Sequence, residues 1–119
     1  MIASVDEYLG RRFDPERYDC LHFAREVWRA ATGEDLEERL PGFFGAASAR
    51  RLAPGLFKPF RRLETPSEPC LVLLQRPGCA VPHVGVFVLG KLLHLRPSGP
   101  THEDLGDAAI GFTRVRCFA

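Results

Sequence analysis

Apolar residues recur at helical spacing between residues 20 and 31. They fall at positions i, i+3, i+4, i+7, i+8 and i+11, which form one face of an α-helix, while charged residues occupy the opposite face. Asp19 is a favourable N-cap for this helix, and Gly33 is a favourable residue just beyond its end. The apolar face consists of Cys20, Phe23, Ala24, Val27, Trp28 and Ala31.

The segments on either side of this helix have weaker patterns. Apolar spacing predicts a short helix over residues 2–12, which the sequence Phe-Asp-Pro at 13–15 ends. Residues 35–40 favour one more helical turn. Residues 41–69 are rich in Pro, Gly and Arg, so we expect an irregular excursion packed by aromatic side chains, with a short helix near residues 46–52.

The hydrophobic period changes after residue 70. It predicts a buried strand over 71–75, a hairpin of strands over 84–88 and 92–96, and a last strand over 110–118. Residues 101–104 favour a capped helical turn. Helices followed by an antiparallel sheet predict an α+β domain, and 119 residues suffice for a single domain with one modest core.

The predicted hairpin determines which side chains share a face. With Leu89 and Gly90 as the central turn residues, Gly85 lies opposite His94, and His83 lies diagonal to His94. Because side chains alternate along a strand, a loop of two or four residues keeps both histidines on one face. Gly85 has no side chain and leaves room there for an imidazole ring.

A cysteine at a helix start and a histidine at a strand start are the parts of a thiol nucleophile. The helix dipole and its free amides favour a thiolate, so we expect a lowered thiol pKa at Cys20 and an oxyanion site at its own N–H group. His83 is the candidate base, and His94 is expected to orient its ring. Asp19 is better placed as a helix cap than as a catalytic acid.

Composition adds few constraints to this chemistry. The chain is 45% hydrophobic and 26% charged with a formal net charge of +1, so neither nucleic acid nor membrane is expected as a partner. The basic stretch over residues 50–62 is interpreted as solvated surface. The N-terminus lacks the pattern of a signal peptide, and no apolar run reaches membrane-spanning length, which favours synthesis in a reducing cytoplasm.

The cysteines and histidines also allow a different kind of site. The four cysteines form no Cys-x-x-Cys pair, so disulfides are not expected; Cys70 and Cys117 are predicted in the core and Cys79 at the surface. His102, in a polar segment, is expected to be solvated. A metal site of one thiolate and three imidazoles is the alternative, but its spacings are not those of zinc ligands, and neither metal nor cofactor is expected. Its ligands would be Cys20, His22, His83 and His94.

Three motifs carry a family resemblance: Asp19-Cys20 at a helix start, His-Val-Gly-Val-Phe at 83–87, and His94. They are similar to the motifs of the NlpC-type cysteine peptidases, the papain-like cell-wall endopeptidases, in which a third polar residue follows the strand histidine. Over residues 8–118 the chain resembles the small tail-associated members that bacteriophages and prophages encode.

The resemblance implies a papain-like fold, with N-terminal helices packed on a small antiparallel sheet. It implies hydrolysis of amide bonds in peptidoglycan stem peptides, between D-glutamate and a diamino acid, without a cofactor. In a phage tail it implies local wall digestion during DNA entry, or assembly with other tail-tip proteins. The triad would be Cys20, His83 and His94, and the substrate groove would be formed by Tyr18, Asp19, His22 and Gly85.

The chain departs from the family pattern in two places. Leu21-His22 stands where Ser-Gly is usual, and Glu68-Pro69-Cys70 replaces the common Gly-Asp. His22 points away from the face of Cys20 and is interpreted as a structural or rim residue. Two alternatives therefore stay open: a non-catalytic tail-tip protein that keeps the fold, and an intracellular thiol amidase or acyltransferase.

Overall fold

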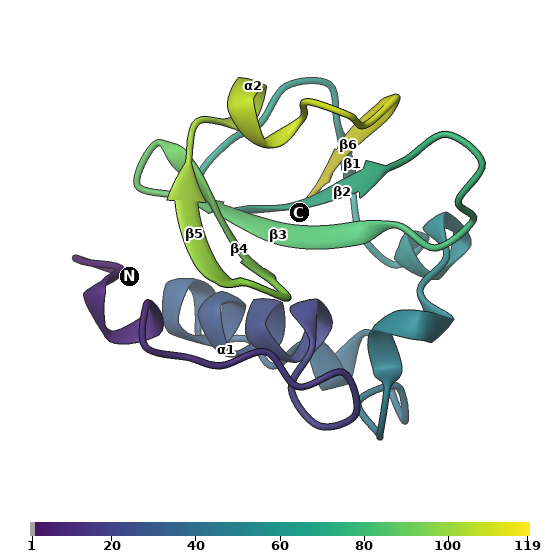
Figure 1. Cartoon of the computed structure of the whole chain (residues 1–119), viewed down its shortest axis with the longest axis horizontal. Coiled ribbons are helices and arrows are strands. Elements are labelled where there is room, and N and C mark those ends of the chain that lie inside the picture. The colour runs from purple at the N-terminus through teal and green to yellow at the C-terminus, as the bar shows by residue number, and fades with distance from the viewer. Residues whose placement is uncertain (1) are drawn as a thin grey trace.

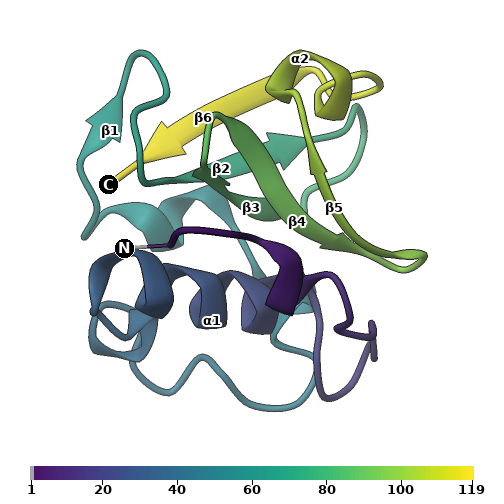
Figure 2. The same ribbon diagram turned by 90° about the vertical axis from the view of Figure 1, so that its left-hand side faces the viewer.

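The computed structural model, which describes residues 2–119, is an α+β fold in which one sheet separates two helices. α1 (Cys20–Thr32) lies along one face of the sheet and the short α2 (Leu105–Ala108) lies over the other, as Figures 1 and 2 show from two sides. The predicted α+β class is confirmed. The six antiparallel strands are ordered β1-β6-β2-β3-β4-β5, with bounds Arg62–Leu63 (β1), Cys70–Gln75 (β2), His83–Val88 (β3), Lys91–Arg96 (β4), Gly99–Glu103 (β5) and Arg114–Phe118 (β6).

α1 begins and ends where the sequence predicts. The Asp19 carboxylate accepts hydrogen bonds from the amides of Leu21 and His22. Gly33 ends the helix in the left-handed region at φ 81°, and its amide donates to Arg29 O. The predicted apolar face is the one that packs on the sheet. Within residues 2–119, no helix has both the length and the apolar character needed to cross a membrane.

Alternation along the strands gives the sheet two different faces. The predicted hairpin register is confirmed, since Val86 pairs with Leu93 around a turn in which Leu89 and Gly90 have φ of 51° and 77°. The inner face, toward α1, carries the larger core, which includes Leu71, Leu73, Val84, Val86, Val88, Leu93 and Leu95. The outer face carries a smaller core beneath α2, which includes Cys70, Val72, Leu74, Leu92, Ala108 and Cys117.

The segment between α1 and β2 is an irregular excursion packed by aromatic rings, as predicted. It contains short 3-10 turns at Leu36–Glu38, Ser48–Arg51 and Pro54–Phe57. The Phe57 ring centroid lies 5.3 Å from the rings of both Phe60 and Phe118. This cluster joins the excursion to the last strand of the sheet.

Two predicted helical elements are wrong. Residues 2–12 contain only a 3-10 turn at Asp6–Tyr8, because the buried Tyr8 ring packs edge-on against Phe23 of α1 and this tertiary contact sets the path of the chain. Residues 101–103 of the predicted turn belong to strand β5, and the helical turn α2 begins only after Asp104. The free edge of β4 offers a row of backbone donors and acceptors, and five consecutive residues pair with it.

The last strand is shorter than predicted, and the first was not predicted at all. β6 begins only at Arg114, because the chain after α2 turns at Gly111, which has φ 88°, and the Thr113 amide then bonds to Gln75 O. β1 has two residues, too few for a hydrophobic period, and it pairs with the end of β6.

The Phe23 ring should be a major source of stability, because it is fully buried between α1 and the sheet. We expect Phe23→Ala to lower the free energy of unfolding by about 3–5 kcal/mol. Urea denaturation measures the change. Ile110→Ala is the control: that side chain is 78% exposed, and its loss should change stability by less than about 0.5 kcal/mol. Equal effects of the two substitutions would contradict the packing described here.

Candidate active site

A cleft of about 580 Å³ opens at the end of the sheet where α1 begins. Cys20 lines it from the first residue of α1, and His83 lines it from the first residue of β3. Leu95 and Arg96 at the end of β4, and Phe112 after α2, form further parts of the wall. The structure therefore brings the predicted nucleophile and the predicted base to one cleft from distant parts of the chain.

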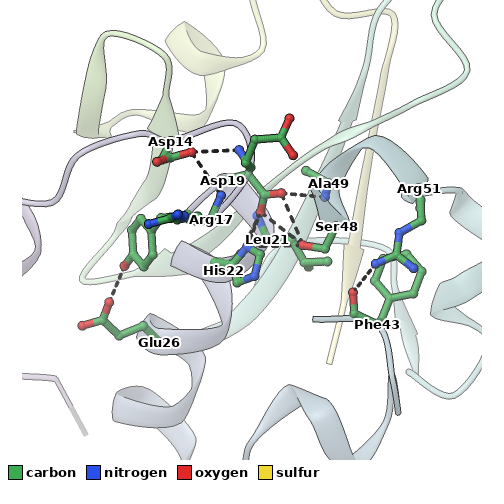
Figure 3. A network of polar contacts seen from close by, with 12 residues as sticks. Asp14, Arg17, Asp19, Leu21, His22, Glu26, Phe43, Ser48, Ala49 and Arg51 are labelled. Carbon is green, nitrogen blue, oxygen red and sulfur yellow. Dashed lines mark hydrogen bonds and ion pairs between the residues drawn. The ribbon is translucent and has the colours of Figure 1, made fainter. Parts of the chain in front are cut away.

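The Asp19 carboxylate joins the start of α1 to the excursion (Figure 3). Its Oδ1 accepts hydrogen bonds from the Leu21 and His22 amides at 3.1 Å each and lies 2.8 Å from His22 Nδ1. Its Oδ2 accepts the Ala49 amide at 2.7 Å, and the Ser48 hydroxyl donates to it at 3.3 Å. The predicted helix cap is thus confirmed. The same carboxylate also fixes Ala49, which forms part of the cleft wall.

These contacts keep a buried carboxylate charged. Burial alone would raise the pKa of Asp19, but hydrogen bonds from the Ala49 amide and from the ring and amide of His22 outweigh it. The pKa of Asp19 is therefore lowered, although its side chain is nearly inaccessible to solvent. A buried charge with this many donors is a structural anchor, and its protonation would release both the helix start and the loop.

The Cys20 thiol is almost covered, with 7% of the residue exposed. Burial raises the pKa of Cys20 to about 11, although amides of Val84, of Cys20 itself and of Leu21 are directed at the sulfur and oppose the change. The negative charge of Asp19 raises it further. The expected lowering of the thiol pKa at a helix start is wrong for this structure, because desolvation exceeds the effect of the backbone amides.

The contact with the Val84 amide also locates the sulfur. Val84 is the second residue of β3 and directly follows His83. The sulfur at the start of α1 thus lies against the start of β3. The amides of Leu21 and His22 are bonded to Asp19, which leaves the Cys20 amide as the helix-start donor that Asp19 does not occupy.

The two predicted histidines form a hydrogen-bonded pair. His83 Nε2 lies 2.8 Å from His94 Nδ1, with the rings 5.0 Å apart and nearly edge to face. The register that places them on one face is confirmed. Gly85 makes the pairing sterically possible, because a Cβ there would lie 2.8 Å from both His94 Cβ and Leu92 Cδ1. With Nε2 of His83 occupied by His94, Nδ1 is the ring nitrogen left to receive a thiol proton.

Both imidazoles are neutral in the resting protein. Burial, together with the nearby His94, Arg96 and Arg76, lowers the pKa of His83 to about 3. Burial and Arg96 lower the pKa of His94 to about 4. Cys20 is a neutral thiol over the same range of pH. The cleft therefore holds a neutral thiol and neutral imidazoles, not a thiolate–imidazolium ion pair.

Tyr18 and His22 lie outside the lining of the cleft. The Tyr18 hydroxyl donates to Glu26 on the next turn of α1, which also pairs with Arg11. The His22 ring is held between Asp19 and the edge of Phe44, at 6.0 Å between ring centroids. Of the four residues expected to form the substrate groove, Asp19 is the one that lines this cleft. Gly85 lies behind the histidine pair.

Several side chains around the pair were not anticipated. Phe112 stacks on His83 with ring centroids 6.4 Å apart and an interplanar angle of 19°, and the Arg76 guanidinium covers Phe112 at 4.9 Å. Cys79, exposed as predicted, lines the same cleft as Cys20. His102 is not solvated: its Nε2 lies 2.8 Å from Val88 O. Sequence offered little indication of Phe112, because it follows an irregular turn.

The alternative metal site is not assembled. Among residues 2–119, no three His, Cys, Asp or Glu side chains are grouped so that they could hold a metal ion. His22 bonds to Asp19, whereas His83 and His94 bond to each other. All four cysteines are free thiols.

Known proteins offer no further assignment: neither protein-family models, nor curated protein sequences, nor solved structures give a match to this chain.

Gly85→Ala should disturb the histidine pair, because the new methyl group would overlap both His94 and Leu92 of β4. We expect the free energy of unfolding to fall by about 1–3 kcal/mol, as measured by urea denaturation. Gly106→Ala is the matched control, since a Cβ at that position of α2 meets nothing within 4 Å. A Gly85→Ala protein as stable as the control would show that the strands have more room than the structure gives them.

Thiol alkylation should report the buried state of Cys20. At pH 8 we expect iodoacetamide to modify the exposed Cys79 well before Cys20, because only the thiolate reacts and the pKa of Cys20 is raised to about 11. The rate at Cys20 should continue to rise with pH toward that value. Peptide mass spectrometry resolves the two sites. A rate at Cys20 that levels off below pH 8 would instead indicate a stabilised thiolate.

Proposed function

We propose that this chain is a cysteine peptidase of the papain-like NlpC type, which hydrolyses amide bonds in peptidoglycan stem peptides. The observation that supports it most strongly is the single cleft lined by Cys20 and His83, with His83 Nε2 held 2.8 Å from His94 Nδ1. A thiol and an imidazole in one cleft, with a second imidazole bonded to the first, supply the groups that nucleophilic catalysis requires.

The first half-reaction begins from the neutral pair. As the Cys20 sulfur attacks the scissile carbonyl carbon, its proton passes to Nδ1 of His83, so charge develops only when substrate is present. The Cys20 amide donates to the oxyanion that forms. Collapse of the tetrahedral intermediate breaks the C–N bond. The imidazolium gives its proton to the leaving amine, and a thioester remains on Cys20.

The second half-reaction restores the enzyme. His83, neutral again, takes a proton from a water molecule that attacks the thioester carbonyl. The C–S bond then breaks, the sulfur regains a proton from His83, and the carboxylic acid product leaves. The net reaction is hydrolysis of one amide bond, with no oxidant, reductant or cofactor consumed.

The charge of the cleft agrees with an acidic peptide. Arg50, Arg76 and Arg96 line it. Arg50 pairs with Glu16 and Arg96 with Glu103, so Arg76, which covers Phe112, is the lining arginine that an acidic group would meet. Stem peptides that contain D-glutamate carry a free carboxylate beside the scissile bond. The resemblance also implies assembly with other phage proteins at a tail tip, which would bring the chain to the cell wall.

A non-catalytic scaffold of the same fold is the second candidate, and the burial of the thiol favours it. Cys20 is only 7% exposed, and its pKa is raised to about 11. A residue retained only for packing would have the same properties. The two candidates differ in one respect: only the enzyme forms a covalent bond between Cys20 and an acyl group.

Hydrolysis of purified muropeptides tests the proposal. We expect the wild-type chain to release new amines, and Cys20→Ala and His83→Ala to reduce the rate by about 10³-fold or more. Cys79→Ala is the matched control, because it removes an exposed thiol from the same cleft and should leave the rate within about twofold. Chromatography with mass spectrometry measures the products, and intact-protein mass spectra detect the acyl-enzyme.

Identical behaviour of wild type and Cys20→Ala would leave the scaffold as the function. Amide substrates that are not cell-wall components are tested in parallel. Cleavage of these alone would support thiol catalysis by Cys20 but contradict peptidoglycan as the substrate.

A further inference from the structure

The third member of the site has a ring nitrogen without a partner. His94 is 1% exposed, and its Nδ1 is bonded to His83. Among residues 2–119, its Nε2 has no hydrogen-bond partner. A buried imidazole N–H or lone pair left unpaired is costly. The nearest charged oxygen is Oε1 of Glu103, 3.8 Å away.

Strand pairing places Glu103 on the same face of the sheet as His94. His94 pairs with Thr101 and Leu92 pairs with Glu103, so Glu103 is the diagonal neighbour of His94. The carboxylate is held by Arg96, whose Nη2 donates to Oε1 at 2.9 Å. A carboxylate held by Arg96 thus lies 3.8 Å from the unpaired nitrogen.

We propose that Glu103 is a positioning residue that holds His94 in the tautomer with its proton on Nε2, and through His94 sets His83 to accept a proton at Nδ1. The effect of Glu103 on catalysis rests on the function proposed above. The position of the proton on His94 is independent of that function, because it follows from the arrangement of these side chains alone.

The two tautomers of His94 have opposite effects on the base. With the proton on Nε2, His94 presents a lone pair at Nδ1 and accepts the N–H of His83 Nε2. Nδ1 of His83 is then a free acceptor for the thiol proton. With the proton on Nδ1, His94 donates to His83 Nε2. The His83 proton then lies on Nδ1, and the ring cannot accept a proton there.

Glu103 is the group beside Nε2 that can decide between these states. A carboxylate only accepts hydrogen bonds, so it favours an N–H at Nε2. Thr101, whose buried Oγ1 also has no partner within residues 2–119, can donate or accept and favours neither state. Arg96 only donates, and its guanidinium is bonded to Glu103.

Ring ¹⁵N NMR of the full chain tests the proposal at a pH where both histidines are neutral. In the wild type we expect His94 to carry its proton on Nε2. Glu103→Gln replaces an acceptor by an amide that can also donate, so the share of the Nδ1–H tautomer should rise measurably. Asp104→Asn is the matched control: it removes one negative charge from the adjacent, exposed residue, which makes no side-chain cap bond, and should leave the tautomer unchanged.

Muropeptide hydrolysis gives the second readout. Glu103→Gln should lower kcat by about 10- to 100-fold, because it changes the proton placement on His83. A change in KM would report the loss of the ion pair between Glu103 and Arg96, since Arg96 lines the cleft. Glu103→Asp, which keeps the charge, should recover part of the loss.

The result that overturns the proposal is a wild-type His94 protonated on Nδ1, or a tautomer that Glu103→Gln does not alter. The wild-type spectrum alone tests the first of these, so a poorly folded variant does not weaken the test. If wild type does not hydrolyse muropeptides but the spectra agree with expectation, the proposed function fails and the role of Glu103 in setting the tautomer stands.

Discussion

The arrangement of the site depends on one buried carboxylate. Asp19 caps α1 with one oxygen and holds the Ala49 amide with the other, so a single charged group fixes both the start of the helix and a wall of the cleft. Donors surround the charge, and they keep its pKa low despite burial. Because Cys20 is the next residue, the cap sets the position of the sulfur at the start of α1.

Burial decides the chemical character of the sulfur. Both a helix start and nearby amides favour a thiolate, yet the pKa of Cys20 is raised to about 11, which leaves roughly one thiol in 10⁴ ionised at pH 7. His83 is neutral for the same reason. Under the proposed mechanism, Cys20 and His83 would react only if a bound substrate let the proton transfer and the attack occur together. The thiol is protected from adventitious alkylation by the same burial that raises its pKa.

Sequence predicted the central helix and the histidine pair because both follow from short-range regularities. A capped period of 3.6 residues fixes which face of α1 is buried, and a period of two fixes that His83 and His94 share a face. Sequence missed β5 and therefore Glu103. Polar residues at 99–103 have no hydrophobic alternation, and their strand exists because the edge of β4 needs a partner. Once the segment is identified as a strand paired with β4, side-chain alternation and the pairing register together place Glu103 diagonal to His94 on one face.

The two faces of the sheet explain why the site lies at its end. Cys20 belongs to the inner layer with α1, whereas His83 and His94 point from the outer face, under α2 and Phe112. A side chain on one face of a continuous sheet cannot reach a side chain on the other. The two layers meet only where strands stop, which is why the proposed nucleophile is the first residue of its helix and the proposed base is the first residue of its strand. His94 lies further along its own strand, inside the sheet, where it can be buried and held by a neighbouring strand. The end of the sheet thus carries the proposed reacting groups, and its interior carries the residue proposed to set their protons.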